Sequence, residues 1–318
     1  GYEEFRPDTS GSYTNDIDSY LKKYRLHKAV EMMKNFRNTH KIEADDVMTL
    51  ALQFECLGDH IVKLDTENNH SIPLNDKETS AFLDALNDFY RQSDFRKFFD
   101  QHSDVYANGI LSFYNSVISH IDPSWYSRFY GTQPNKDLHI VIGFASGGNY
   151  YRATRTRQGG PEEIFSIMYY AVDNNGRPLY DKSAVGTITE ELCLSFIDIE
   201  NNDVKTTLEK ACENVHRYTR EKPIAAVTDK SIMEESLAYA SAIYYLIDNG
   251  SSKKSIRKAV DEGIERGFSW TPELTKRIYY YTENRKEFPT FASFYPEIIE
   301  FFKDYTANLG KTILKVLR

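Results

Sequence analysis

The sequence has no long apolar run, few cysteines and a deficit of positive charge. No stretch approaches the roughly 18 apolar residues of a membrane-spanning helix, so we expect no transmembrane segment. The net charge of −8 argues against a protein that binds the nucleic-acid backbone. Cys56, Cys193 and Cys212 stand at unrelated spacings, which fits neither a disulfide framework nor a zinc knuckle.

The chain does have enough apolar and aromatic residues for a packed core. Of its 318 residues, 41% are hydrophobic and 27% are charged, which is typical of a folded domain rather than a disordered chain. The 23 Tyr and 19 Phe would suit a surface that binds carbohydrate or peptide, although core packing is the commoner use of such residues.

Hydrophobic periodicity predicts an α+β protein that is mostly helical, with a small antiparallel sheet in the middle. We expect a flexible arm over residues 1–13, a helical N-terminal lobe over 14–135 and a second lobe over 136–318, the lobes packed as one unit. Apolar residues at three- and four-residue steps mark the helices. They are expected within 16–36 and 45–57, and at 79–90, 95–106, 110–121, 206–218, 231–247, 254–267, 272–281 and 296–317. Gly250 and Gly267 stand where helix C-caps are expected.

Two β-branched segments, 137–144 and 164–172, predict the strands of the sheet. The glycine-rich stretch between them predicts a hairpin turn near a cleft, formed by Gly147, Gly148, Asn149 and Tyr150. The basic residues that follow predict a solvated loop, with contact to an acidic ligand as the less favoured alternative: Arg152, Arg155 and Arg157. A helix is expected to begin near residue 183.

That helix carries two adjacent acids, Glu190 and Glu191, within the segment 187–196. The segment reads like H-E-x-x-H, in which two histidines on one helix face bind zinc and the glutamate acts as general base. Aligned by its flanks, Glu190 and Leu194 occupy the two histidine positions and Glu191 that of the base. The simpler interpretation is that both acids stand at a helix start, where the helix dipole favours them.

The residues for a catalytic zinc site are missing from this segment. Such a site needs three protein ligands and one open position. Leu194 cannot ligate a metal, and Cys193 points about 100° away round the helix. No two histidines lie four residues apart anywhere in the chain. We therefore predict no zinc and no other cofactor, and Glu191 would be a vestigial base with no metal to acidify its water.

The stretches around this helix carry a family resemblance over about residues 20–305. Matching segments lie at 44–52, 82–90, 95–99, 147–150, 187–196, 235–240 and 267–270. They are similar to the secreted Bacteroidetes proteins grouped as domain of unknown function 4932, which resemble zincins. The resemblance implies a zincin-like core and makes Glu235, beside Glu234, the third ligand position. The chain departs from the family at both histidines and at Tyr239, which replaces an arginine. Tyr239 is also expected to lie in the cleft, with residues 147–150.

The resemblance also implies export to the periplasm or the cell surface. Gly1 stands where a full chain would begin with Met, so we expect that an export signal, with or without a lipid anchor, has been removed.

Two classes of function remain open on the sequence. The first is a non-catalytic, zincin-like binding protein, a pseudo-metallopeptidase, whose cleft takes a peptide or glycan. Strand 138–144 or 164–172 would then pair with a bound peptide. The second is an active hydrolase, either a peptidase with atypical ligands or a carboxylate-based glycan hydrolase that uses Glu190, Glu191 and Glu235. A calcium ion among these oxygens is a weaker variant, and the simplest interpretation of Glu235 is a solvated acid in the first turn of its helix.

Overall fold

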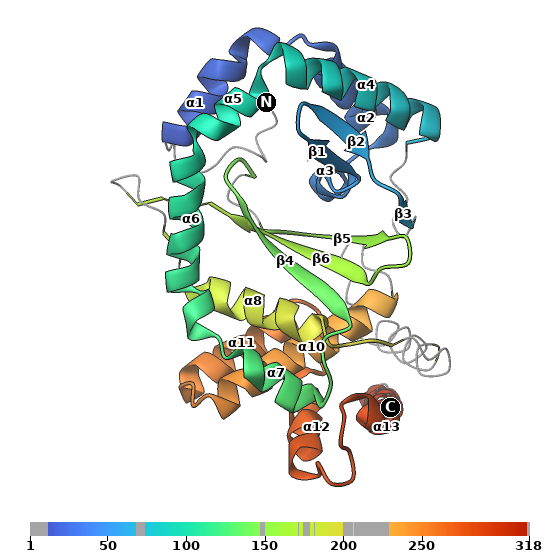
Figure 1. Ribbon diagram of the computed structural model, residues 1–318. Coiled ribbons are helices and arrows are strands. Elements are labelled where there is room, and N and C mark those ends of the chain that lie inside the picture. Colours follow the sequence, from blue (N-terminus) through green and yellow to red (C-terminus); the bar gives the residue numbers. More distant parts are fainter. Residues whose placement is uncertain are drawn as a thin grey trace. The chain divides into compact units, whose positions relative to one another are not determined.

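The chain forms two compact units in the computed structural model, which is drawn in Figure 1. The structure describes residues 12–67, 74–146, 150–170, 172–173, 179–180, 182–199, 206 and 229–316. The first unit joins Gly1–His120 to Lys136–Ala184, and the second joins Ile121–Asn135 to Val185–Arg318. The sheet, which the sequence placed in the C-terminal lobe, thus groups with the N-terminal helices.

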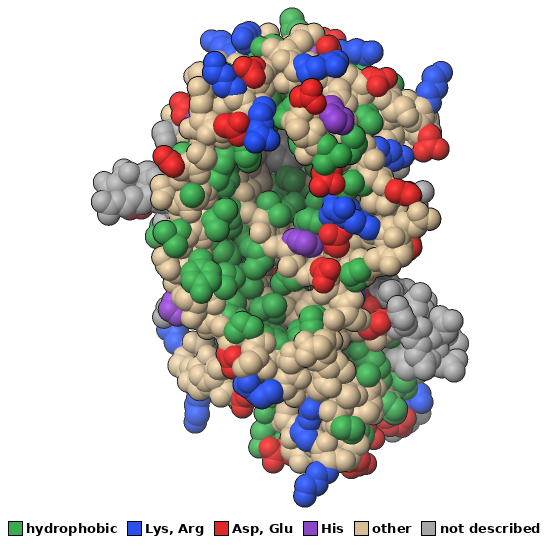
Figure 2. Space-filling model, in the orientation of Figure 1, with side chains coloured by type: hydrophobic (Ala, Val, Ile, Leu, Met, Phe, Trp, Pro, Cys, Tyr) green, Lys and Arg blue, Asp and Glu red, His purple; other side chains and the backbone are tan. Residues whose placement is uncertain are grey.

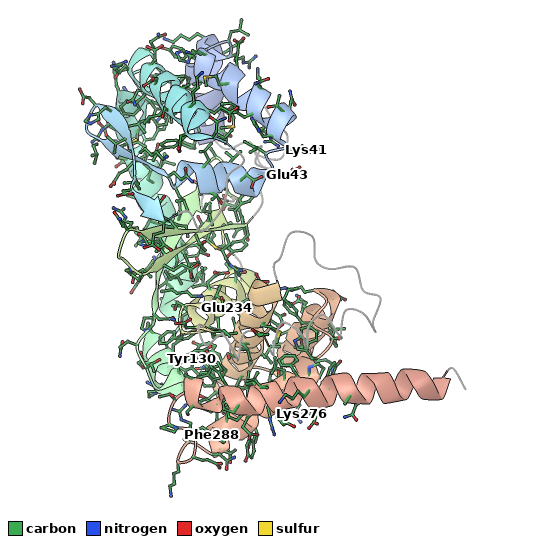
Figure 3. All side chains as sticks on the ribbon, turned by 90° about the vertical axis from the view of Figure 1, so that its right-hand side faces the viewer. Lys41, Glu43, Tyr130, Glu234, Lys276 and Phe288 are labelled. Atoms are coloured by element: carbon green, nitrogen blue, oxygen red, sulfur yellow. The ribbon has the colours of Figure 1, made fainter. Side chains whose placement is uncertain are left out.

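The helices of the first unit begin and end at recognisable local signals. Asn75 opens one of them with a capping box, in which its side chain and that of Glu78 satisfy each other's backbone N–H groups. Lys41 adopts a left-handed φ of 55° between the helices 28–40 and 44–51, and Glu43 caps the N-terminus of the second helix (Figure 3). The elements are α1 (Ser12–Leu21), η2 (Lys22–Tyr24), α2 (Lys28–His40), α3 (Ala44–Ala51), α4 (Asp76–Gln92), α5 (Phe95–Gln101), α6 (Ser103–Ser116) and η3 (Ile118–His120).

A two-stranded hairpin follows α3, where the sequence predicted that the helix would continue to residue 57. Strands β1 (Phe54–Leu57) and β2 (His60–Lys63) pair across a turn in which Gly58 has a φ of 66°. The helix prediction was wrong here because Gly58 marks a tight turn rather than a helix end. Asn87 on α4 fixes the hairpin, since its amide bonds both the N–H of Ile61, at 2.7 Å, and the C=O of Ile61, at 2.8 Å.

The main sheet of the first unit has the strand order β3-β5-β6-β4. It consists of β3 (Thr66–Glu67), β4 (Lys136–Gly143), β5 (Tyr151–Arg157) and β6 (Glu162–Tyr169). β5 runs antiparallel to β3 and to β6, whereas β4 and β6 are parallel. The expected antiparallel sheet is therefore a mixed sheet. The prediction failed because β5 was taken as a turn and a loop. Since β5 lies between β4 and β6 along the chain and runs antiparallel to β6, β4 and β6 point in the same direction.

The position of each strand corrects two further expectations. Segment 164–172 cannot add a peptide strand along β6, because β6 is paired on both sides and its side chains are buried along nearly its whole length. β4 lies at one edge of the described sheet, and its side chains alternate between more and less exposed. Pairing with a bound peptide is therefore still expected only for segment 138–144. The arginines predicted to lie on a loop lie on β5 instead.

The second unit is built from helices. Its elements are α7 (Pro123–Tyr130), most of α8 (Lys182–Leu194), α10 (Asp229–Asp248), α11 (Lys253–Glu265), α12 (Thr271–Glu283), η4 (Ala292–Phe294) and α13 (Tyr295–Val316). Trp270, Ile278 and Phe302 are fully buried in its core. Gly250 and Gly267 both take positive φ just beyond helix ends, which confirms their predicted capping positions. The expected helix at 206–218 and Cys212 lie outside the described residues, apart from helical Thr206.

Within the described residues, no helix is both long and apolar enough to cross a membrane. α6 nevertheless presents several large apolar side chains on the surface of the first unit. Ile110, Leu111 and Tyr114 are each more than half exposed, and hydrophobic side chains gather over this helix in Figure 2.

Candidate functional site

The segment that resembles a zinc-binding helix forms the last turns of α8. Glu190 and Glu191 therefore lie toward the C-terminal end of the helix, and its first turn carries no acid. The interpretation of both residues as helix-start acids was wrong, because the helix begins two turns earlier, at Lys182. A carboxylate near a helix C-terminus is disfavoured by the helix dipole, so these acids need other stabilisation. Both are buried: Glu190 is 8% exposed and Glu191 is 1% exposed.

Glu190 is paired with an arginine 76 residues further along the chain. The two terminal nitrogens of Arg266 donate to the two carboxylate oxygens of Glu190, at 2.8 and 2.9 Å. This bidentate geometry is the strongest form of the arginine–carboxylate interaction. The pair occupies both carboxylate oxygens of Glu190, the residue that the sequence alignment placed at the first histidine position.

Arg266 is held in place by aromatic rings and by the end of its own helix. Its guanidinium lies 4.5 Å from the ring centre of Tyr239 and 5.3 Å from that of Phe268. It follows the last residue of α11 and precedes Gly267, whose φ of 94° turns the chain towards α12. The guanidinium, which follows α11, therefore stacks on a tyrosine of α10.

The electrostatics of the site favour the charged form of Arg266. Burial alone lowers the pKa of Arg266, but the hydrogen bonds and charge of Glu190, followed by weaker contributions from Tyr239 and Glu235, raise that pKa above its ordinary value. Burial also raises the pKa of Tyr239 to about 12, so its phenol stays neutral and donates to the C=O of Ala259 at 2.8 Å.

The structure brings Glu235 into the same electrostatic environment as Glu190. Glu235 is half-buried on the second turn of α10, and its charge acts on Arg266. The expectation of a solvated acid in the first helical turn was therefore wrong. Glu234, the adjacent candidate, is 8% exposed and acts on a different residue, Tyr295.

The remaining positions of the motif do not offer metal ligands. Leu194 is 7% exposed and ends α8. Cys193 is fully buried, and burial raises the pKa of its thiol far above the ordinary range, which disfavours the thiolate form that binds metals. Among the described residues, no three His, Cys, Asp or Glu side chains are grouped closely enough to hold a metal ion.

The cleft residues named from the sequence do not all lie in one unit. Gly147, Gly148 and Asn149 lie outside the described residues. Tyr150 belongs to the first unit, where its hydroxyl accepts a hydrogen bond from Ser166 at 3.4 Å, and Tyr239 belongs to the second.

The basic residues of β5 contact a glutamate of the neighbouring strand. Arg155 donates to both carboxylate oxygens of Glu163, at 2.7 and 2.9 Å, and Arg157 and His139 also lie within ion-pair distance of that carboxylate. The hydrogen bond from Arg155, although opposed by burial, holds the pKa of Glu163 below its usual range. The acidic group that Arg155 and Arg157 contact is thus part of the chain.

Sequence reasoning did not identify Arg266. The only signal near it was the matching segment 267–270, which begins at the next residue. Nothing in the spacing links it to Glu190, because Glu190 lies on α8 and Arg266 follows the end of α11.

A family model described as "Domain of unknown function (DUF4932)" matches residues 2–301 of the chain. The chain belongs to this family. The match extends over both units and confirms the family suggested by the segments around α8. No curated protein and no solved structure matches the chain.

Proposed function

We propose that this member of the DUF4932 family is a non-catalytic binding protein, a pseudo-metallopeptidase whose zincin-like core has lost its metal. The observation that carries the proposal is the bidentate pair between Glu190 and Arg266. A guanidinium and a metal cation cannot share one carboxylate at the same positions, and Leu194 supplies no second ligand. The motif helix therefore has a structural ion pair where a metallopeptidase would have its cation.

The position of Glu191 supports the same conclusion. A general base must come within hydrogen-bond reach of the water or substrate that it deprotonates. The side chain of Glu191 is 1% exposed, so no solvent-borne substrate reaches it without a rearrangement of α8. The alternative, an active hydrolase, needs that rearrangement and a source of activated water.

The exposed apolar face of α6 supports a role in binding. Ile110 and Leu111 are adjacent, Tyr114 lies one turn later, and each is more than half exposed. Exposed apolar groups of this kind are typical of binding surfaces. We expect a peptide or glycan ligand there, with Tyr114 as the stacking residue.

Metal content tests the proposal most directly. Protein purified without chelator should contain far less than one zinc ion per chain, measured by elemental mass spectrometry. Stoichiometric zinc would overturn the proposal. The matched assay for the alternative measures hydrolysis of protein and glycan substrates by the wild type and by Glu191→Gln. Turnover that the substitution abolishes would establish the hydrolase instead.

Restoring the missing ligands tests the alignment of the helix. The variant Glu190→His, Leu194→His, Arg266→Met should gain zinc affinity, measured by calorimetry, with Glu235 as third ligand. The control carries Leu194→Ala in place of Leu194→His and should bind zinc more weakly, because it has one imidazole fewer. If both variants are folded and neither binds zinc, the alignment with a zinc helix is wrong.

A screen of displayed peptides and arrayed glycans tests the binding surface. Any ligand of the wild type should be lost when Ile110 and Tyr114 are both replaced by Lys. A ligand retained by that variant would place the binding site elsewhere on the protein.

A further inference from the structure

Helix α6 is apolar on two opposite faces, although only one of them is buried in the first unit. The buried face carries Gly109 and Phe113, and Val117 follows directly after the helix, at the same four-residue step. Gly109 lets the helix lie close to its neighbour, because a Cβ added there would lie 2.6 Å from Cζ of Phe144. A helix that is apolar all round is normally buried all round, so the exposed face of α6 is typical of a surface that packs against another molecule.

The exposed face has the residue spacing of a helix–helix contact. Its four apolar residues stand at i, i+3, i+4 and i+7, which places them along one side of the helix. They are Ala107, Ile110, Leu111 and Tyr114, and all four are exposed. We call these four residues the α6 seam; Figure 2 shows hydrophobic side chains gathered over this helix.

The charges around the α6 seam restrict what can bind to it. Residues 105–119 contain no Asp, Glu, Lys or Arg, and residues 98–127 contain no Lys or Arg. Asp104, in the first turn of α6, is exposed. A nucleic-acid backbone and an anionic membrane surface are both bound through Lys and Arg side chains, so neither fits this face. A partner with a cation near Asp104 does fit it.

The size of the α6 seam favours a single helix over a second copy of the chain. Ile110, Leu111 and Tyr114 are 58%, 57% and 54% exposed. At roughly 150 Å² for a whole side chain, they offer about 250 Å². A symmetric dimer would bury about 500 Å² through these side chains, and about 1,000 Å² with an equal share from their neighbours, below the roughly 1,200 Å² of a stable complex. Each copy would also bring its net charge of −8 to the other, whereas weak binding of one helix needs less area.

We propose that the α6 seam binds an amphipathic helix of a partner protein, which lies antiparallel to α6 and has Lys or Arg in its last turn beside Asp104. Apolar residues at i, i+3, i+4 and i+7 of the partner would pack against the seam. Cations are favoured at the C-terminus of a helix, and the antiparallel direction places that end next to the first turn of α6. The inference rests on the binding role proposed above for α6. It names a helix rather than a glycan as the ligand, because the Tyr114 hydroxyl is the only polar group on the seam side chains.

Two synthetic helical peptides test the seam and the direction of the bound helix. Both carry Leu at i, i+3, i+4 and i+7, and they differ only in the last turn, which has Lys in one peptide and Glu in the other. Fluorescence anisotropy at low ionic strength measures their binding to the whole chain. The Lys peptide should bind with a dissociation constant in the micromolar range, and the Glu peptide should bind at least about threefold more weakly. No detectable binding of the Lys peptide would overturn the proposal.

Three variants locate the binding site on the chain. Leu111→Glu should weaken the binding of both peptides at least about tenfold, because it buries an unpaired charge in the contact. Leu26→Glu is the matched control and should bind as the wild type does, since Leu26 is 80% exposed and lies outside α6. Asp104→Asn should abolish the preference for the Lys peptide. Unchanged binding by a folded Leu111→Glu variant, or an equal loss in Leu26→Glu, would show that the seam is not the site, and a preference that survives Asp104→Asn would refute the antiparallel direction.

Two further measurements separate the other occupants of this face. Sedimentation velocity of the wild type should show a monomer, and a dimer that Leu111→Glu dissociates would assign the seam to a second copy and overturn the proposal. A glycan that binds the wild type and Leu26→Glu but not Leu111→Glu would assign the seam to carbohydrate, with the same consequence. Stoichiometric zinc would overturn the non-catalytic function instead and would leave the binding of a helix to α6 intact.

Discussion

Replacing Arg266 with Met isolates what the buried ion pair contributes to the second unit. Methionine keeps the apolar stem of the side chain but ends before the guanidinium, so the loss is the charge, its two hydrogen bonds and the stacking of the guanidinium on Tyr239. Glu190 would then remain buried near a helix C-terminus without its cation. Counted without its backbone, the Glu190 side chain is 10% exposed when it is paired with Arg266.

The expected cost lies between the values for buried and exposed ion pairs. Removing one partner of a fully buried pair costs about 3–5 kcal/mol, whereas exposed pairs contribute about 0.2–1 kcal/mol. Arg266 is 36% exposed, so solvent screens part of the interaction. We therefore expect Arg266→Met to lower the free energy of unfolding by about 2–3 kcal/mol, measured by urea denaturation followed by circular dichroism.

Two further variants separate the pair from other effects. Lys258→Met, on the same helix, breaks an exposed pair with Glu262 and should cost less than about 0.5 kcal/mol. The double variant Glu190→Gln, Arg266→Met removes both charges and should recover more than half of the loss, because no buried charge is left alone. If Arg266→Met costs no more than Lys258→Met, or if the double variant recovers nothing, Glu190 is not stabilised in the way that the structure indicates.

The other substitutions test local packing and one pH effect. Glu163→Gln should make the free energy of unfolding less sensitive to acid below about pH 4.3, as measured by denaturation at a series of pH values. The reason is that Arg155 lowers the folded-state pKa of Glu163. The stability that this carboxylate contributes is present above its unfolded pKa and is lost as pH falls through the lower folded pKa. Gly263→Ala should cost about 1–3 kcal/mol in urea denaturation, because the added Cβ would lie 2.7 Å from Thr271 Oγ1. Gly186→Ala, on α8 with nothing within 4 Å of the added Cβ, should instead stabilise the protein by about 0.5–1 kcal/mol in the same measurement.

Much of the helical structure was predictable because its signals are local. The three- and four-residue periodicity identified the helices that became α4, α11 and α12, and Gly250 and Gly267 indicated two helix ends. The α+β class followed from the short β-branched segments that became β4 and β6.

The sheet topology was harder to predict because it depends on pairing between distant residues. β5 contains three arginines in seven residues, a composition that is typical of a loop rather than a strand. It forms a strand because it pairs with β3 and β6 and because Arg155 forms an ion pair with Glu163. No local sequence pattern predicts these long-range contacts.

The site was predictable in its parts and not in its chemistry. The positions of Glu190, Leu194 and Glu235 came from the alignment. In the structure Glu190 pairs with Arg266, and the charge of Glu235 acts on the same guanidinium. What the sequence could not supply was Arg266, since the partner of a buried charge can come from any helix that packs beside it.

Charge balance links that arginine to the proposed loss of the metal. A carboxylate buried at Glu190, with the charge of Glu235 nearby, needs a counter-charge, which either a metal dication or a guanidinium can provide. If Arg266 has taken that role, it also opposes any return of zinc, because a fixed positive charge beside two imidazoles repels a second cation. We therefore expect Glu190→His, Leu194→His to bind zinc at least tenfold more weakly with Arg266 present than with Arg266→Met, a difference of about 1.4 kcal/mol. Equal affinities by calorimetry would mean that Arg266 can move away from the motif helix, and the pair would then be no barrier to a metal site.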